Sequence, residues 1–283
     1  MINTPRIKNK KKYRKKVKRK SKSTVWHESD LTDQEWLKIK DLFPKKKARS
    51  RGRKRKHDLR AIMNGLRYLL RTGCQWEYIP KYYPPWSVCR YYFDKWKRDG
   101  TLEKINFRLC EEIRVKNGRN ESPTAAVIDS QSKRTTEAGG DRGFDGGKKV
   151  NGRKRFILVD TLGNILAVLV AAADMSDKSG GKKLLEVALE RLKTIRKIWT
   201  DNSFKGLKDW LSSKFNVDLE VVKREDGQKG FVVLPRRWVV ERSFAWLCDY
   251  RRLMVDYEQD MASSVGMILL ASISRSLRNL CHA

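Results

Sequence analysis

The spacing of apolar residues changes once along the chain, from a helical period to strand-like runs. Between residues 30 and 98, apolar side chains recur every three or four positions, which is the period of an amphipathic helix. From residue 124 onward, short continuous apolar runs alternate with helical stretches, and such runs are typical of buried strands. The pattern predicts an α+β fold, with a helical region first and a boundary between residues 115 and 123.

Three helices are predicted in the first region. The first follows Asp30 or Thr32, either of which is a good N-cap, and ends at Pro44. The second ends near Gly73, and the third covers residues 87–98 after a proline-broken turn. This layout resembles a helix-turn-helix. A plain helical bundle has the same apolar pattern, but the basic residues between the aromatics of the third helix favour DNA binding.

The second region alternates strands with helices. A hairpin turn is expected over residues 160–164, because "VDTLGN" places Asp, Gly and Asn between two apolar runs. Strands are expected at residues 124–129, 153–160, 164–174, 195–201, 217–224 and 230–235, and helices at 180–195, 203–215, 236–253 and 264–280.

Charge narrows the class of partner. Lys and Arg number 64 against 33 Asp and Glu, a formal net charge of +31, so a polyanion is the natural partner. The longest apolar run, residues 165–173, is about half of what a membrane span needs, and no signal peptide opens the chain. We therefore expect a cytoplasmic protein without a membrane partner. The scattered cysteines and histidines have no zinc-ligand spacing.

Basic residues gather in three segments. Residues 1–24 hold twelve Lys or Arg and no acid, which predicts a disordered arm that binds phosphates. Residues 45–56 form a basic loop, and a third cluster lies around residues 148–155, where a solvated hairpin tip is the alternative. The expected DNA contacts are Arg53, Lys54, Arg55 and Lys56 in the loop and Lys148, Lys149, Arg153, Lys154 and Arg155 in the third cluster.

Aspartates follow several of the expected strands. Asp160 belongs to the hairpin turn, and Asp174 and Asp177 precede a helix, where capping explains them. Asp129 and Asp201 remain, each directly after a strand-like run. Mg²⁺ prefers oxygen ligands, and a phosphoryl-transfer site needs two or three carboxylates from different elements.

A glutamate lies at the border of an apolar helical stripe near the end of the chain. Glu241 is four residues after Arg237, so an ion pair within one helix is one interpretation. The other is that Glu241 belongs to a cation site with carboxylates from elsewhere in the chain. Spacing alone does not decide between them.

Several motifs resemble the catalytic half of bacterial insertion-sequence DDE transposases of the group numbered five. Upstream, "SDLTDQEWLKI", "KHDLRAIMNGLRYLLRTGCQW" and "PPWSVCRYYFDKW" are similar to the N-terminal DNA-binding region of that family. The resemblance covers about residue 26 to the end. The catalytic motifs are "AAVIDSQS", "GGKKVNGRKRFILVDTLG", "WTDNSFKG" and "PRRWVVERSFAWLCDYRRL".

The resemblance implies a helical DNA-binding domain at 25–118 and an RNase H-like mixed-sheet catalytic domain at 119–283. It also implies that Asp129, Asp201 and Glu241 are catalytic and bind Mg²⁺, for which Mn²⁺ can substitute, and that Arg237 holds a phosphate. The implied reaction is cleavage and strand transfer of double-stranded DNA at terminal inverted repeats. The implied assembly is a homodimer or larger at synapsis, associated with the bacterial nucleoid.

Two departures from the family pattern bear on activity rather than fold. Asn202 and Ser203 follow the second aspartate where the family usually has two glycines, and Leu234 stands where related groups often have tyrosine. Two other functions therefore stay open: a catalytically inactive remnant that only binds DNA, and a hydrolytic nuclease of the same fold.

Overall fold

The computed structural model describes residues 27–44, 55–137, 139–222 and 236–282. The expected basic arm, the expected strand at 230–235, Leu234, Arg53 and Lys54 lie outside the described residues.

The three helices expected in the first region are confirmed. Thr32 caps the first in a capping box with Glu35, Asp58 caps the second, and Gly73 ends the second in the left-handed conformation that glycine favours. A fourth long helix, α4, was not predicted. The elements are α1 Asp33–Ile39, η1 Lys40–Leu42, α2 Leu59–Thr72, η2 Trp76–Tyr78, α3 Trp86–Arg98 and α4 Thr101–Lys116.

The second region builds one six-stranded sheet in the order β2-β3-β1-β5-β6, with β4 pairing β3. β1 is antiparallel to β3 and parallel to β5, so the sheet is mixed, and β3 and β4 form the predicted hairpin through residues 160–164. The strands are β1 Ala125–Arg134, β2 Gly143–Asp145, β3 Val150–Asp160, β4 Ile165–Ala172, β5 Lys197–Thr200 and β6 Asp218–Val221.

Two details of the helices in this region differ from expectation. The predicted helix over 236–253 is interrupted, because α7 ends at Leu247 and a 3-10 turn follows. Asp174 and Asp177 do not cap α5; Ser176 does, by accepting a hydrogen bond from the Ser179 N–H. The elements are α5 Asp177–Arg191, η3 Asn202–Leu207, α6 Lys208–Phe215, α7 Trp238–Leu247, η4 Arg251–Leu253 and α8 Met261–Cys281.

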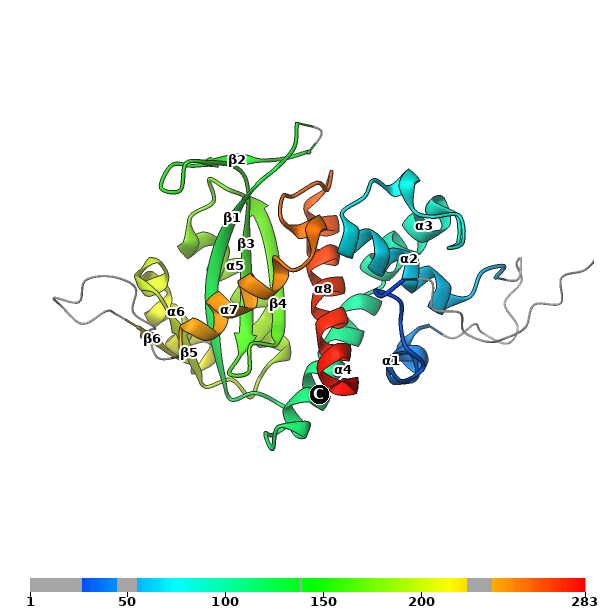
Figure 1. Cartoon of the computed structure of the whole chain (residues 1–283). Helices are drawn as coiled ribbons and strands as arrows, with labels where there is room; N and C mark the ends of the chain where they lie inside the picture. The colour runs from blue at the N-terminus through cyan, green and yellow to red at the C-terminus, as the bar shows by residue number, and fades with distance from the viewer. Residues whose placement is uncertain (1–26, 45–54, 138, 223–235, 283) are drawn as a thin grey trace, which may run out of the picture.

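Apolar side chains cover both faces of the sheet, because strand residues alternate between faces. On β1, Ala126 and Ile128 pack into a core with α5 and α6, whereas Val127 packs into the core on the opposite face, towards α7 and α8. Figure 1 shows α7 crossing the sheet on one side. A side chain on β1 therefore faces α7 only if it lies an even number of residues from Val127, on the same face of the sheet.

The helical region and the sheet share one core. α8 stands between them (Figure 1), and its buried residues belong to the same apolar cluster as those of α1 to α4. Arg114 of α4 also makes a buried ion pair of 2.9 Å with Asp160 at the β3–β4 turn. Residue 118, the expected domain boundary, lies in the connection between α4 and β1. None of the helices in the described ranges is long and apolar enough to span a membrane.

Candidate active site

Asp129 lies on β1 with the parity of Val127, and its side chain therefore faces α7. One carboxylate oxygen accepts a hydrogen bond of 2.7 Å from the N–H of Ser130. Ser130 has the opposite parity, and its hydroxyl donates to Asp177 at the start of α5. Because side chains alternate between the two faces of the sheet along β1, Asp129 faces α7 and Ser130 faces α5.

Asp201 follows β5, the parallel neighbour of β1. Val127 pairs with Trp199 in this register, so Asp129 and Asp201 both lie two residues beyond the same pair, Asp129 within β1 and Asp201 just after β5. Asp201 caps the 3-10 helix η3, and its Oδ1 accepts hydrogen bonds from the N–H and the hydroxyl of Ser203. Neither Asn202 nor Ser203 has a positive φ, so this turn does not need the glycines of the usual family pattern.

Glu241 lies on α7, one turn after Arg237, and the arginine reaches all three carboxylates. Its Nε is 3.6 Å from Glu241 Oε1, and its Nη2 is 3.9 Å from Asp129 Oδ2 and 3.8 Å from Asp201 Oδ2. These separations exceed hydrogen-bond length, and Arg237 Nε is buried without a hydrogen-bond partner. Glu241 thus pairs with Arg237, as the first interpretation expects, and the same guanidinium lies near Asp129 and Asp201.

Burial controls the charge of Asp129. It raises the pKa of Asp129 to about 6, and the nearby negative charge of Asp201 adds to this effect. The Ser130 N–H, Arg237 and Lys148 oppose the rise, because each favours the ionised form. The carboxylate thus lies in surroundings where added positive charge would be strongly favourable.

The three acidic side chains have the chemistry of a divalent-cation site. They supply only oxygen donors, and the exposed fractions of Asp129, Asp201 and Glu241 rise from 13% to 27% to 45%, so the group opens towards solvent. Among the residues that the structure describes, no three His, Cys, Asp or Glu side chains form a ready-made metal cluster. The cation that lies between these carboxylates is the guanidinium of Arg237.

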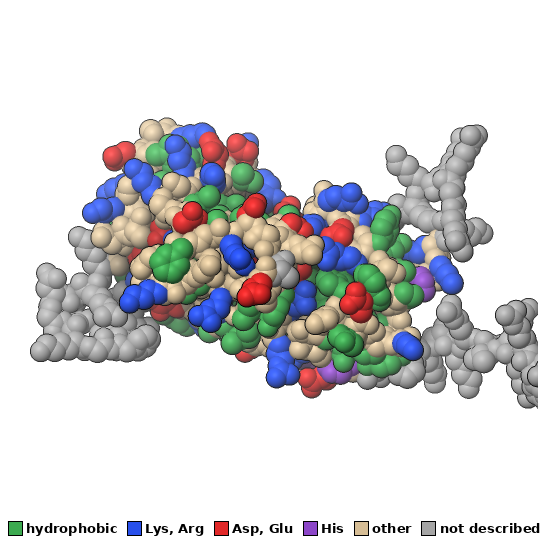
Figure 2. Space-filling view, turned by 90° about the horizontal axis from the view of Figure 1, so that it is seen from above, with side chains coloured by type: hydrophobic (Ala, Val, Ile, Leu, Met, Phe, Trp, Pro, Cys, Tyr) green, Lys and Arg blue, Asp and Glu red, His purple; other side chains and the backbone are tan. Residues whose placement is uncertain are grey.

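Lys148 and Lys149 are exposed in the turn between β2 and β3, and Lys148 is close enough to Asp129 to affect its pKa. The Lys148 ammonium lies 3.5 Å from the carbonyl oxygen of Ser130, next to Asp129. Arg55 and Lys56 are also exposed, just before α2. Seen from above (Figure 2), Lys and Arg side chains are spread over the surface with Asp and Glu between them, rather than gathered in one patch.

The expectation that Arg153, Lys154 and Arg155 contact DNA is wrong, because β3 is covered on both faces and all three are buried. Arg153 is 0% exposed and binds Asp256 and the carbonyl oxygen of Glu258. Arg155 and Lys154 donate to the carbonyl oxygens of residues 253 and 175. The sequence held a signal for this burial: Arg153, Lys154 and Arg155 directly precede the apolar run at residues 156–159 and lie within the same strand, not in the turn between β2 and β3.

The sequence interpretation overlooked Arg242, which lies one residue after Glu241. Its guanidinium stacks between two rings of α7, 4.3 Å from the centre of Trp238 and 4.5 Å from that of Trp246. The spacing of four residues on either side of Arg242 predicts this stack on one helix face. Trp246 also lies 3.1 Å below the guanidinium of Arg275 on α8.

Comparison with known proteins gave two family matches. Residues 31–106 match the family DUF4096, whose description is "Putative transposase of IS4/5 family", and residues 120–274 match the transposase DDE domain. The second match alone covers more than half of the chain. A search of curated proteins found no significant match.

Proposed function

Because the chain belongs to the DDE transposase family, whose catalytic domain has an RNase H-like fold, we propose that it cuts DNA at the terminal inverted repeats of an insertion sequence and joins those ends to new DNA. The helical region, 25–118, recognises the ends, and residues 119–283 carry the chemistry. Two ends must be held together for joining, so the active assembly is a homodimer or larger.

The observation that carries this proposal is the convergence of three distant carboxylates on one guanidinium. We assign Asp129, Asp201 and Glu241 as the residues that would hold Mg²⁺, with Mn²⁺ as a substitute. DDE domains use divalent ions, which activate the attacking oxygen and neutralise charge on the phosphate when bound. The oxygen-only donor set fits such an ion.

The remaining chemistry belongs to the protein side chains. Ser203 fixes Asp201 and the Ser130 N–H fixes Asp129, so two carboxylates are oriented before DNA arrives. Arg237 turns from the carboxylates to an oxygen of the DNA phosphate, for which a guanidinium is well matched. Lys148 and Lys149 neutralise backbone phosphates beside Asp129.

The attack is in line on a phosphodiester, first by water and then by the freed 3′-hydroxyl. The attacking oxygen forms the new P–O bond as the leaving oxygen departs, so no covalent link between protein and DNA is needed. This separates the mechanism from that of tyrosine or serine recombinases.

A joining assay tests the function and separates it from the two alternatives. Purified protein is mixed with a pre-cleaved terminal-repeat duplex and target DNA, with Mg²⁺, Mn²⁺ or a chelator. Joined product supports a transposase, cutting without joining indicates a nuclease, and binding alone indicates an inactive remnant. Asp129→Asn, Asp201→Asn and Glu241→Gln should each abolish joining, whereas Asp209→Asn, at an exposed position of α6, should not.

A further inference from the structure

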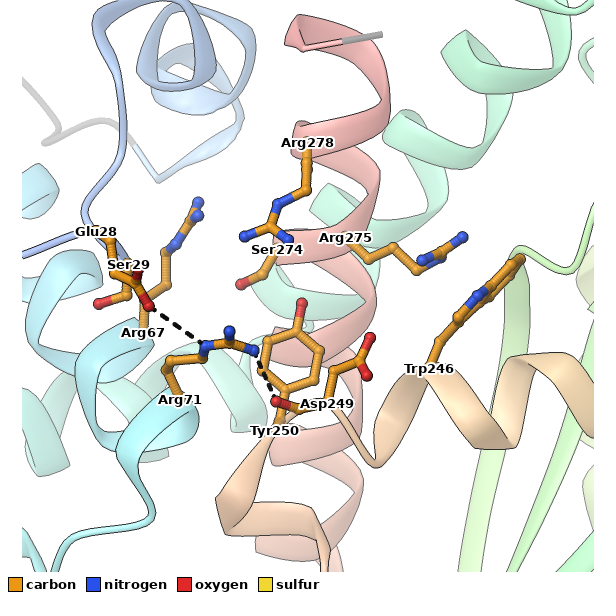
Figure 3. A pocket seen from close by; sticks show the side chains of 10 residues that line it. All are labelled: Glu28, Ser29, Arg67, Arg71, Trp246, Asp249, Tyr250, Ser274, Arg275 and Arg278. Carbon is orange, nitrogen blue, oxygen red and sulfur yellow. Dashed lines mark hydrogen bonds and ion pairs between the residues drawn. The ribbon is translucent and has the colours of Figure 1, made fainter.

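A pocket separate from the carboxylates lies where three parts of the chain meet. α2, the end of α7 with the residues that follow it, and α8 surround most of it, the segment before α1 adds Glu28 and Ser29, and four arginines line it (Figure 3). Arg67 and Arg71 come from α2, and Arg275 and Arg278 come from α8. Positions about 200 residues apart in the chain thus place four cations around one small space.

Only two of these arginines are neutralised by neighbours. Arg67 pairs with Glu35 at 3.5 Å, and Arg71 pairs with Glu28 at 3.8 Å and donates to the carbonyl oxygen of Asp249. Arg275 and Arg278 have no carboxylate within ion-pair distance in the described part of the chain.

Arg275 is held in a place that disfavours its charge. Its pKa is lowered to about 10, mainly by burial and also by the positive charges of Arg242 and Arg278, although Tyr250 and Asp249 oppose the decrease. The guanidinium is nevertheless charged at neutral pH. An anion in the pocket would relieve both the desolvation and the repulsion.

A buried hydroxyl faces the same space. Ser274 is only 7% exposed, lines the pocket, and its Oγ has no hydrogen-bond partner. Buried hydroxyls without a partner are rare, because the loss of hydrogen bonds to water is costly. Figure 3 shows Ser274, the Tyr250 hydroxyl and Arg278 directed to one region, so hydrogen-bond donors and cations converge there.

Two carboxylates also line the pocket, and neither cancels its charge. Glu28 is 76% exposed and is already paired with Arg71. Asp249 is exposed at the rim. Four arginines against Glu35, Glu28 and Asp249 leave one excess positive charge, and within the described residues the two arginines without an ion pair are both on α8.

We propose that this pocket binds a phosphate group of the DNA backbone, away from the phosphate that reacts. The donors directed to one region are the Arg278 guanidinium and the hydroxyls of Ser274 and Tyr250 (Figure 3), a set that suits a tetrahedral oxyanion, and Arg275, which extends towards Trp246, adds positive charge on the other side of the pocket. That the anion belongs to DNA rests on the proposed function.

The position of α7 connects the pocket with the carboxylates. Glu241 and Trp246 are five residues apart on this helix, an axial rise of about 7.5 Å, and Arg242, next to Glu241 in the chain, stacks on the Trp246 ring. Because about 140° around the helix separates these two positions, the pocket and the carboxylates lie on different sides of α7, and a DNA that contacts both would wrap this helix rather than cross one face of it. Because α2 supplies half of the arginines, a phosphate here would also contact both the helical region and the catalytic region.

The test compares neutralising variants with a matched control in the full-length chain. Arg275→Gln and Arg278→Gln each remove one pocket charge, and Arg196→Gln removes one exposed charge before β5. Binding to a duplex DNA is measured across a salt series. Each pocket variant should bind more weakly and reduce the salt slope by about one, whereas the control should match the wild type.

Inorganic phosphate provides a second probe that does not depend on DNA. Phosphate titration should change the tryptophan fluorescence of the wild type, because Trp246 lies against Arg275. The change should disappear in Trp246→Phe and weaken at least tenfold in apparent affinity in Arg275→Gln.

The outcomes separate this proposal from the proposed function. If both pocket variants behave like Arg196→Gln with DNA and with phosphate, the pocket proposal is overturned, whether or not the wild type joins DNA. If the wild type joins nothing but retains the phosphate response through Trp246, the function fails and phosphate binding stands. Arg278 is exposed, so Arg278→Gln should fold. This variant alone therefore tests the pocket proposal if Arg275→Gln unfolds.

Discussion

The guanidinium of Arg237 lies 3.8 Å from the carboxylate of Asp201, although 36 residues separate them in the chain. The same group also reaches Asp129 and Glu241, so one side chain offsets the repulsion among three acids. In the proposed reaction, this arginine must leave the carboxylates before a divalent ion can bind between them. Arg237 is therefore a stabilising partner of the carboxylates and, in that proposal, would compete with the metal.

Arg237→Gln should separate these two roles. Without the guanidinium, the carboxylates repel one another, so the free energy of unfolding without metal should fall by about 1–3 kcal/mol. Mn²⁺ binding, measured by titration calorimetry, should become tighter because no side-chain cation competes. DNA joining should nevertheless decrease. Unchanged Mn²⁺ affinity would contradict the competition.

Asp129→Asn should stabilise the protein while removing joining. The folded-state pKa of about 6 lies above the usual value near 4, so stability from the protonated form is complete below pH 4 and is lost as the pH rises through 6. The amide mimics the protonated acid. The variant should thus exceed the wild type by about 2–3 kcal/mol in urea unfolding at pH 8, and the difference should shrink towards pH 4. A constant difference across this range would count against the raised pKa.

Arg153→Gln should destabilise the fold rather than weaken DNA binding directly. Asp256 is almost fully buried beside Arg153, and removing one partner of a buried pair costs about 3–5 kcal/mol. Lys149→Gln is the matched comparison, since Lys149 is exposed at the hairpin tip. It should leave the unfolding midpoint in urea unchanged and weaken binding to duplex DNA. Similar stability of the two variants would show that Arg153 is not structural.

Ser203→Ala should reduce the rate of joining by less than tenfold, because the Ser203 N–H still holds Asp201 when the hydroxyl is lost. Asp201→Asn, in contrast, should abolish joining. Single-turnover rates at saturating Mg²⁺ make the comparison. A loss as large as that of Asp201→Asn would mean that the hydroxyl has a direct role in the reaction.

The helix ends and the strand-end aspartates could be predicted from the sequence, because they depend on neighbouring residues. Thr32 and Gly73 mark helix ends because capping needs only nearby atoms, and Asp129 and Asp201 follow apolar strand runs. The family resemblance then added Glu241, which spacing had left open. The RNase H-like fold class and the transposase family are both confirmed by the family matches.

Features set by distant partners were not readable. Arg153 and Arg155 looked like surface charges because their carboxylate partner, Asp256, is about 100 residues away. The arginine pocket draws on α2 and α8, so no local pattern shows it. Residue type gives the charge of a side chain but not its burial. Burial is what removes Arg153, Lys154 and Arg155 from the basic residues that are available to DNA.

The shared core around α8 limits how this protein can be divided. The last helix of the chain completes the packing of the first helices, so residues 27–116 expressed alone would expose a large apolar surface and should aggregate. A chimera that borrows the N-terminal half of another transposase would need the matching C-terminal helix as well. Two regions that look separable in the sequence therefore depend on each other for their packing.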